Sequence, residues 1–255
     1  MQGQRTLLVC QQVEKRFGGL AAVKNLSFEI HEGEILGLIG PNGAGKTTLF
    51  NLITGVFKPN AGSIFFNGSD ITKSPAHKIT QMGIARTFQL IRPFSDMTVL
   101  ENATLAGVFG GSKAPDIARR DAAVYLEFVD LIDCSDSKAA NLTPFDKKKV
   151  ELASALNTKP KLLLLDEFIA GLTMGDMEDA ITLITKLRDE HGITIFWIEH
   201  VMKAIMTVAE RILVIHYGEK IADGIPREIA QDKGVVEAYL GSEFVEEGVD
   251  SAESK

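Results

Sequence analysis

Residues 35–50 read ILGLIGPNGAGKTTLF, and this stretch decides the fold. The run Ile35–Ile39 is apolar and suits a buried strand, and residues 40–47 match the pattern G-x-x-x-x-G-K-[ST]. Glycines let successive backbone N–H groups curve around an anion, and a helix that starts at Lys46 directs its positive end at the same point. The strand–loop–helix order therefore predicts a site for a nucleoside triphosphate.

The candidate phosphate-binding residues of this loop are Gly40, Asn42, Gly43, Gly45, Lys46 and Thr47. The Lys46 ammonium group can supply positive charge to the β and γ phosphates, and the Thr47 hydroxyl is a candidate ligand of Mg²⁺. The competing interpretation is a glycine turn that happens to contain a lysine. The strand before the loop and the helix after it favour the nucleotide site.

A second buried strand, Leu162–Leu165, ends in Asp166 and Glu167. Ligands of open α/β sheets bind at the carboxyl ends of the strands, so Asp166 is a candidate Mg²⁺ ligand through water and Glu167 can polarise the attacking water. Another apolar run, Ile193–Ile198, leads to His200, which can reach the γ-phosphate. A lone histidine or a strand-end carboxylate is more often structural, and only the phosphate loop favours the functional interpretation.

Two other residues are candidates on weaker patterns. Gln89 follows Arg86-Thr87-Phe88, and its side-chain oxygen can ligate Mg²⁺. Phe17 precedes a Gly-Gly turn, where its ring can either stack on adenine or pack in the core. The residues alone leave both interpretations of Phe17 open.

The rest of the chain alternates between strands and helices. Strands are expected at Thr6–Cys10, Leu26–Ile30, Ser63–Phe66, Arg211–His216 and Lys220–Ala222, and helices at Lys46–Gly55, Ala122–Leu131, Met177–Arg188 and Val201–Ala209, with one more between Asn141 and Thr158. Asn67-Gly68 predicts a tight hairpin turn, and Thr98–Glu101 a capping box. This alternation predicts an α/β fold whose parallel sheet is covered on both faces.

Charge and composition argue against several classes of function. The net charge of −7 argues against nucleic acid as the main partner, because a polyanion needs a basic face. The two cysteines, Cys10 and Cys134, match no metal-binding pattern and are expected to be reduced thiols. There is neither a signal peptide nor an apolar run of the roughly 20 residues that span a membrane, so membrane association is expected through a partner.

Together and in this order, these residues resemble the ABC ATPase family from about Leu7 to Gly241. The resemblance implies a P-loop NTPase (RecA-like) core with a mixed sheet, an antiparallel β subdomain and an inserted helical subdomain. The ATPase domain would span residues 1–241, with the core in 1–89 and 158–241 and the helical subdomain in about 90–157. Residues 242–255 are acidic and are expected to form a disordered tail.

The resemblance also implies roles for single residues. Gly40–Thr48 becomes the phosphate loop, which adds Thr48, and Phe17 becomes the adenine-stacking ring. The catalytic residues would be Lys46, Glu167 and His200, the last as the switch histidine. The magnesium ligands would be Thr47, Gln89 and Asp166, with the Gln89 region facing the membrane subunit.

A narrower similarity points to the ATP-binding subunits of importers for branched-chain amino acids, amides and urea. The stretches that carry it are Phe17–Leu20, Gly40–Phe50, Gly83–Gln89, Met97–Ala103, Ala170–Leu172, Ile198–His200 and Glu237–Gly241. It implies ATP and Mg²⁺ as cofactors, integral membrane permease subunits as partners, a second ATP-binding subunit and, indirectly, a solute-binding protein. The chain would sit at the cytoplasmic face of the cell membrane.

One stretch departs from the family. Its signature Leu-Ser-Gly-Gly-Gln, which contacts ATP held by the other subunit, is replaced here by Leu142, Thr143, Pro144, Phe145 and Asp146. Pro144 removes a backbone donor, Phe145 is expected to place a ring where glycine allows close approach, and Asp146 brings negative charge. The same residues make a good helix start. The lysines at 147–149 are expected to form a solvated face.

The residues around Lys46 that would bind and hydrolyse the ATP of this chain are intact, whereas the signature is altered. This difference suggests an asymmetric pair with a different ATPase subunit. Three alternatives remain on the sequence: a regulatory subunit that binds ATP and hydrolyses little, a soluble ABC ATPase acting on DNA or ribosomes, and a phosphotransferase. The single ATPase domain and acidic balance argue against the second, and the phosphotransferase lacks an acceptor site.

Overall fold

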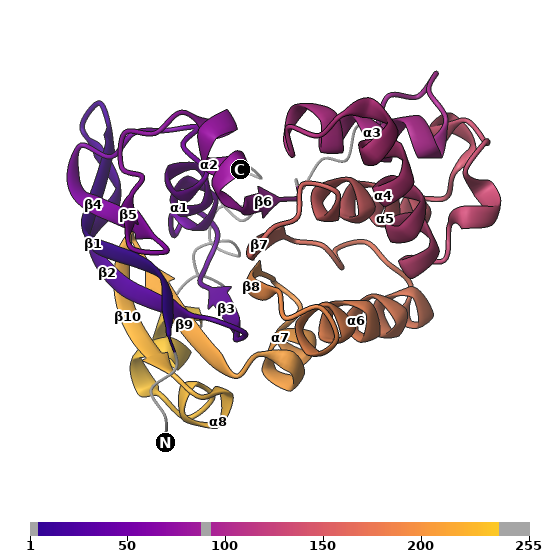
Figure 1. The fold of residues 1–255 in the computed structure, drawn as a ribbon. Helices are drawn as coiled ribbons and strands as arrows, with labels where there is room; N and C mark the ends of the chain where they lie inside the picture. The colour runs from indigo at the N-terminus through magenta and orange to yellow at the C-terminus, as the bar shows by residue number, and fades with distance from the viewer. Residues whose placement is uncertain (1–4, 88–92, 240–255) are drawn as a thin grey trace, which may run out of the picture.

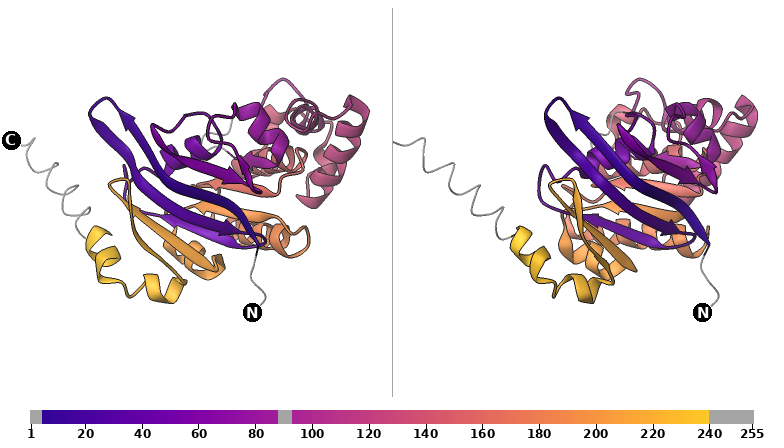
Figure 2. Two further views of the ribbon diagram at one scale, coloured as in Figure 1. Left: turned by 60° about the vertical axis from the view of Figure 1, so that its left-hand side comes forward. Right: turned by 90° about the vertical axis from the view of Figure 1, so that its left-hand side faces the viewer.

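The computed structural model describes residues 5–87 and 93–239. The chain begins with two long antiparallel strands, β1 (Thr6–Phe17) and β2 (Leu20–His31). With β4 (Ala61–Phe66) and β5 (Ser69–Asp70) they form a sheet in the order β2-β1-β4-β5. Figure 2 shows β1 and β2 running side by side as a curved ribbon along one flank of the molecule.

The central sheet has the strand order β10-β9-β3-β8-β7-β6. The strands are β3 (Ile35–Ile39), β6 (Ile84–Arg86), β7 (Leu162–Asp166), β8 (Thr194–Ile198), β9 (Arg211–His216) and β10 (Glu219–Gly224). All neighbours pair in parallel except β10, which is antiparallel to β9. Every residue of β3, β7 and β8 is buried, as expected for parallel strands covered on both faces.

Side chains of each central strand alternate between two hydrophobic cores, because successive residues of a strand point to opposite faces. From β3, Leu36 and Leu38 face one core, which lies between the central sheet, α1 (Lys46–Ile53) and the antiparallel sheet. Ile35 and Ile39 face the other, which is covered by α5 (Pro144–Leu156), α6 (Met174–Asp189) and α7 (Met202–Val208). Both cores therefore fix the strand ends against the helices that follow them.

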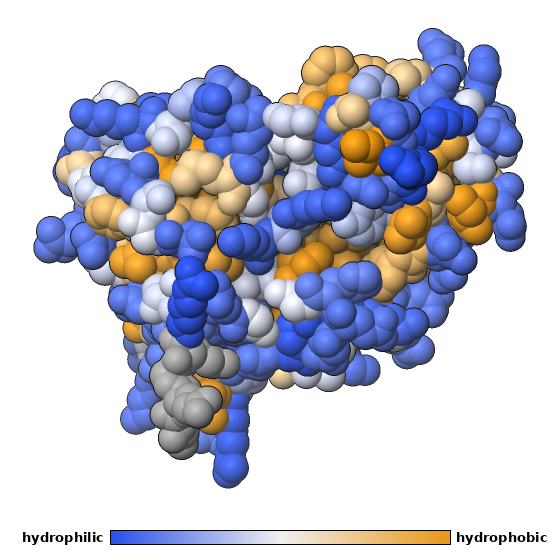
Figure 3. Space-filling model, viewed as in Figure 1, coloured by the Kyte–Doolittle hydropathy of each residue, from blue (hydrophilic) through white to orange (hydrophobic). Residues whose placement is uncertain are grey.

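Three helices pack together at one end of the central sheet (Figure 1). They are α3 (Val99–Phe109), α4 (Pro115–Phe128) and α5 (Pro144–Leu156), and two 3₁₀ turns, Ile132–Cys134 and Ala139–Asn141, connect the last two. Hydrophobic residues gather on the surface over this helical part (Figure 3), and Phe109 and Val124 are 74% and 61% exposed.

The sequence predicted this architecture, and several details are confirmed. Asn67 and Gly68 both have positive φ in the turn from β4 to β5, and Thr98 and Glu101 form the capping box of α3. The sequence pattern did not predict α2 (Ala76–Met82) or β6, and the strands β1 and β2 are longer than predicted. Within residues 5–87 and 93–239, no helix is both long and apolar enough to cross a membrane.

Other expectations are untested. The division into a core and a helical subdomain with the stated boundaries stays a prediction. Gln89 and the acidic tail at 242–255 lie outside the described residues. The short helix α8 (Pro226–Ile229) follows β10, residues 233–239 are helical as well, and the described chain ends at Tyr239.

Candidate functional site

The phosphate loop connects β3 to α1 and is shaped by close backbone contacts. Gly45 caps α1 with φ of +105°, and a Cβ atom there would lie 2.3 Å from the carbonyl oxygen of Ala22. At Gly40 a Cβ atom would lie 2.1 Å from the carbonyl oxygen of Ile215. Any larger residue would push the loop off its supports, so glycine is required at both positions. No side chain caps the start of α1, which leaves its amide groups to a ligand.

Lys46 lies at the first position of α1 and is 6% exposed. Its Nζ donates to the carbonyl oxygens of Gly40 at 2.6 Å and Pro41 at 3.0 Å, so the ammonium group is held over the loop. Burial lowers the pKa of Lys46, while the nearby carboxylates of Glu167 and Asp166 act to raise it. Thr47 is exposed at the same helix end and Thr48 is half-buried.

Asp166 is the last residue of β7, and its carboxylate is buried at 3% exposure. Its Oδ2 accepts from Arg86 Nη2 at 2.6 Å, and Arg86 Nη1 donates to Asn51 Oδ1 at 2.6 Å. Burial raises the pKa of Asp166, and the Arg86 hydrogen bond and charge act against that rise. Arg86 was not predicted as a site residue, although its position three residues before the candidate Gln89 was an available signal.

Glu167 and His200 meet beside Asp166. The His200 Nε2 lies 2.8 Å from Glu167 Oε1, and the two side chains are 41% and 16% exposed. Glu167 has a φ of +52°, a left-handed conformation that is uncommon for residues other than glycine and frequent at functional sites. Asp166 pairs with Ile198 in the sheet, so the ends of β7 and β8 bring Glu167 and His200 together.

These residues suit a magnesium ion held with phosphate. Mg²⁺ prefers oxygen ligands, keeps several waters and takes few protein side chains. The Thr47 hydroxyl and the Asp166 carboxylate supply that kind of donor, and Asp166 interacts electrostatically with the adjacent Lys46. In the described part of the chain, no group of three or more His, Cys, Asp or Glu residues is arranged so that it could hold a metal ion by itself.

Phe17 ends β1 and is 44% exposed. Its ring meets Phe57 edge-on, with centroids 5.2 Å apart, and Lys15 Nζ lies 5.2 Å from its centroid. The ring is supported from one side and open on the surface, an arrangement that a stacking base can use. Core packing, the competing interpretation of Phe17, is therefore wrong.

Tyr239 was not identified from the sequence. Its side chain is hydrogen-bonded by the backbone N–H of Gly40, and burial raises its pKa to about 12. The C-terminal end of the described chain thus contacts the first glycine of the phosphate loop. Tyr239 and Gly40 are far apart in the sequence, so only the folded structure shows that they are in contact.

The altered signature stretch forms the start of α5. Thr143 caps the helix: its hydroxyl accepts from the Asp146 N–H at 3.1 Å and donates to Asp146 Oδ2 at 2.7 Å. Phe145 is 6% exposed and packs in the core, with Lys149 Nζ 4.8 Å from its ring centroid. Phe145 was expected to place its ring where glycine allows close approach, and this expectation is wrong because the ring is buried in the core.

The expected solvated face of lysines is also wrong for one residue. Lys148 is 8% exposed, whereas Lys147 and Lys149 are half-buried. The helical period explains the difference, since Lys148 lies three residues from the buried Phe145 on the same face of α5.

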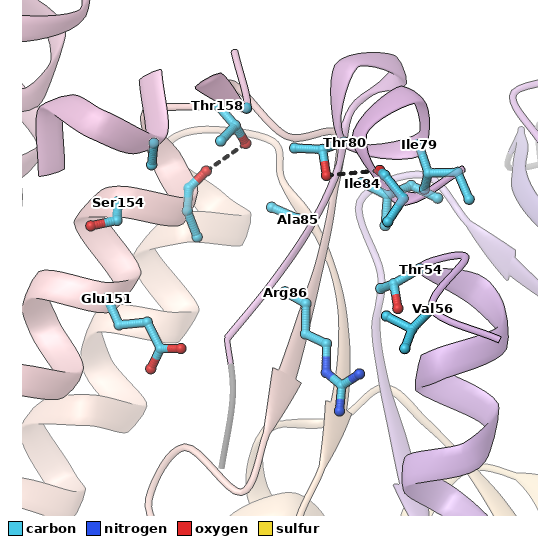
Figure 4. A pocket seen from close by; sticks show the side chains of 14 residues that line it. Thr54, Val56, Ile79, Thr80, Ile84, Ala85, Arg86, Glu151, Ser154 and Thr158 are labelled. Atoms are coloured by element: carbon cyan, nitrogen blue, oxygen red, sulfur yellow. Dashed lines mark hydrogen bonds between the residues drawn. The ribbon is translucent and has the colours of Figure 1, made fainter. Parts of the chain in front are cut away.

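A cleft lies beside the site, between α1, α2 and β6 on one side and α3 and α5 on the other (Figure 4). Its volume is about 400 Å³, and its lining is mainly apolar. In Figure 4, Ile79 and Thr80 of α2 face Glu151 and Ser154 of α5 across the cleft, with Arg86 between them. The same arginine that pairs with Asp166 therefore also lines the cleft.

Comparison with known families gives two matches. Residues 23–170 match the family model described as ABC transporter. Residues 219–245 match the model described as branched-chain amino acid ATP-binding cassette transporter. The first match contains the phosphate loop and both strand-end carboxylates, and the second contains Tyr239.

Individual proteins agree with the family models. The high-affinity branched-chain amino acid transport ATP-binding protein LivG of Salmonella typhimurium is 41% identical over 249 residues, covering 92% of this chain and 98% of the relative. BraF of Pseudomonas aeruginosa, which has the same description, is 39% identical over 254 residues, covering 93% and 98%. Among solved structures, a nucleotide-free ATP-binding cassette from an ABC transporter matches with a TM-score of 0.84 at 32% identity, covering 92% and 98%. The ADP conformation of such a cassette matches with a TM-score of 0.84 at 33% identity, covering 92% and 99%.

Proposed function

This chain belongs to the ATP-binding proteins of ABC transporters, and from that premise we propose that it hydrolyses ATP to power an importer of branched-chain amino acids or related small polar solutes. The observation that carries the proposal is the meeting of Lys46, Glu167 and His200 at one edge of the central sheet. The solute class rests on the names of LivG and BraF and on the C-terminal family match.

The geometry suggests how the residues act on ATP. Amide groups at the start of α1 and the Lys46 ammonium group bind the β and γ phosphates. Glu167 orients and polarises the attacking water, and His200, 2.8 Å from its carboxylate, fixes its orientation. Mg²⁺, held by Thr47 and Asp166, would neutralise phosphate charge when bound. Gln89 is the third expected ligand.

We infer further that this subunit works in an asymmetric pair with a different ATPase chain. Its own ATP would meet the signature of the partner and be hydrolysed, whereas ATP of the partner would meet the start of α5. Thr143 and Asp146 satisfy each other there, Pro144 supplies no N–H group, and the carboxylate repels phosphate. All three features weaken anion binding at that helix end.

The cleft of Figure 4 is the proposed docking place for a membrane-spanning permease subunit. It is mainly apolar, and it joins the helical part to Arg86, which holds Asp166. Movement of a docked element would therefore reach the nucleotide site through one side chain. In this arrangement the subunit lies at the cytoplasmic face of the cell membrane, a solute-binding protein delivers the solute, and nucleic acid has no part.

The first test is ATPase activity of the purified chain, alone and mixed with its candidate partner ATPase. We expect little turnover alone, activity in the mixture, and its loss when this chain carries Glu167→Gln. Full activity of the chain alone would contradict the asymmetric pair. Uptake of labelled leucine by cells that carry the wild type or Glu167→Gln tests the import function and its solute class. This test is independent of the ATPase assay.

A further inference from the structure

The turn from β7 to α6, residues 167–173, begins with Glu167, and the two residues that follow Glu167 are buried. Phe168 and Ile169 are 3% and 0% exposed. Two bonds inside the turn satisfy part of its backbone: Ala170 N–H to the Glu167 carbonyl at 3.2 Å and Leu172 N–H to the Ile169 carbonyl at 3.3 Å. Buried N–H and C=O groups need partners, so side chains must serve the others.

Lys148 serves the carbonyl groups of this turn. From α5, its Nζ donates to the carbonyl oxygens of Phe168 at 2.8 Å, Ala170 at 3.0 Å and Glu167 at 3.3 Å. An ammonium group has three donors and no acceptor, so three converging carbonyls match it completely. Burial lowers the pKa of Lys148, and the charges of Glu199, Glu151 and Glu167 act to raise it.

Glu199 serves the N–H groups on the other side. It is 1% exposed, and its Oε1 accepts from Ile169 N–H at 2.9 Å and from Trp197 Nε1 at 3.3 Å. Its Oε2 accepts from the His200 N–H at 3.2 Å. A carboxylate is an acceptor only, and this one is filled by donors. Burial raises its pKa, and these N–H donors act to lower it.

We propose that Lys148 and Glu199 are positioning residues of ATP hydrolysis, a pair of buried opposite charges that clamp the turn between them and so set the Glu167–His200 geometry. Lys148 holds the backbone of Glu167, and Glu199 holds the backbone of His200. The 2.8 Å separation of those two catalytic side chains therefore depends on both charges.

The clamp also links the two nucleotide-facing ends of the subunit. Lys148 lies five residues after Thr143, the cap of α5, which is about 7.5 Å along a helix. A shift of the α5 start, which faces the partner in the proposed asymmetric pair, would pull directly on the Glu167 carbonyl. The positioning role itself requires only the ATPase activity of the chain.

The test uses the native complex, purified through a tag on this chain, with Lys148→Met, Lys148→Arg and Glu199→Gln. Activity is expressed per bound nucleotide, with Glu167→Gln defining the complete loss at this site. Lys148→Met is expected to lower kcat by about ten- to hundredfold, the size expected when a reacting group is displaced by about 1 Å. The KM for ATP should stay within about twofold, because Lys46 and its loop are untouched.

The matched control is Lys147→Met, which removes the same charge from the neighbouring position of α5 and should leave kcat unchanged. Lys148→Arg keeps a buried cation with several donors and should restore at least part of kcat. Glu199→Gln keeps the shape of the side chain and should also lower kcat with little change in KM. If kcat per bound nucleotide stays within twofold of wild type in both Lys148→Met and Glu199→Gln, while only the melting temperature falls, the clamp is structural and the proposal is wrong.

Discussion

The starts of α1 and α5 are built in opposite ways. At α1 the capping residue is Gly45, no side chain closes the helix end, and Lys46 adds positive charge. At α5 the Thr143 hydroxyl accepts from the Asp146 N–H and donates to the Asp146 carboxylate. One helix end is left for an anion, and the other is satisfied by its own residues.

The start of α6 shows which of the two is the ordinary construction. Thr173 accepts from the Asp176 N–H at 3.2 Å and donates to Asp176 Oδ2 at 2.8 Å, as Thr143 does with Asp146. Since α6 starts with a plain structural cap, α5 does too. Four residues therefore decide whether a helix end binds phosphate or only begins a helix.

The largest effect is expected at the α1 end. Lys46→Ala removes the positive charge that holds the loop and faces the phosphates, so ATP hydrolysis should fall by about 10²- to 10³-fold, as when a charge-stabilising donor is removed. ATPase assays of the native complex measure this. Lys78→Ala, an exposed lysine of α2, is the control and should keep wild-type activity. A similar loss in both variants would remove the distinction between an open and an ordinary helix end.

Substitutions that make the start of α5 available to an anion are expected to raise ATPase activity. Pro144→Gly with Asp146→Gln restores a backbone donor and removes the repelling carboxylate while keeping the buried Phe145. We expect ATPase activity of the chain alone to rise by about tenfold, equivalent to about 1.4 kcal/mol. The control is Asp176→Gln at the matching position of α6, which should leave activity unchanged. If the ATPase activity of the double variant alone does not rise, the sequence at the start of α5 does not limit hydrolysis by the chain alone.

The sequence predicted the α1 end better than the α5 end for a physical reason. The phosphate loop is a local pattern, and its strand, turn and helix are adjacent in the chain. Asp166, Glu167 and His200 follow from the rule that strand ends gather at one sheet edge. The inward direction of Phe145 and the burial of Lys148 depend on how α5 packs against the turn after β7, which no local pattern encodes.

Residues that were missed altogether lie in contacts between distant segments. Arg86 reaches Asp166 across 80 positions of the chain, and Tyr239 reaches Gly40. The sequence indicated a site near Arg86, because the nearby Gln89 was already a candidate Mg²⁺ ligand. Tyr239 lies within Glu237–Gly241, a stretch that carries the narrower family similarity, but no local pattern there marked the tyrosine as a contact of the phosphate loop.

A smaller effect tests whether the two threonine caps are equivalent. Thr143→Ala and Thr173→Ala each remove a capping hydroxyl, and each should lower the free energy of unfolding by about 1 kcal/mol. Denaturant unfolding measures both, and Thr104→Ala inside α3, whose hydroxyl only bonds back to Leu100, is the control with a smaller loss. A much larger loss at Thr143 than at Thr173 would show that α5 begins with more than an ordinary cap.

The last effect, no larger than that of the two threonine caps, is expected at Tyr239, which supports the open start of α1 and not the closed start of α5. Tyr239→Phe removes the hydroxyl that accepts from the Gly40 N–H, leaving a buried donor without that partner. The loss should be about 1 kcal/mol, which corresponds to roughly fivefold weaker ATP binding if the bond is needed to hold the loop. Titration with a fluorescent ATP analogue measures the affinity, and Tyr217→Phe is the matched control because Tyr217, beside β9, is 72% exposed.

The free energy of unfolding should fall by the same amount if the bond supports the folded loop generally, whereas reduced affinity with unchanged stability would mean that Tyr239 acts on the nucleotide-bound loop. Unchanged values of both would show that the glycine contacts with Ala22 and Ile215 are enough to hold the α1 end open.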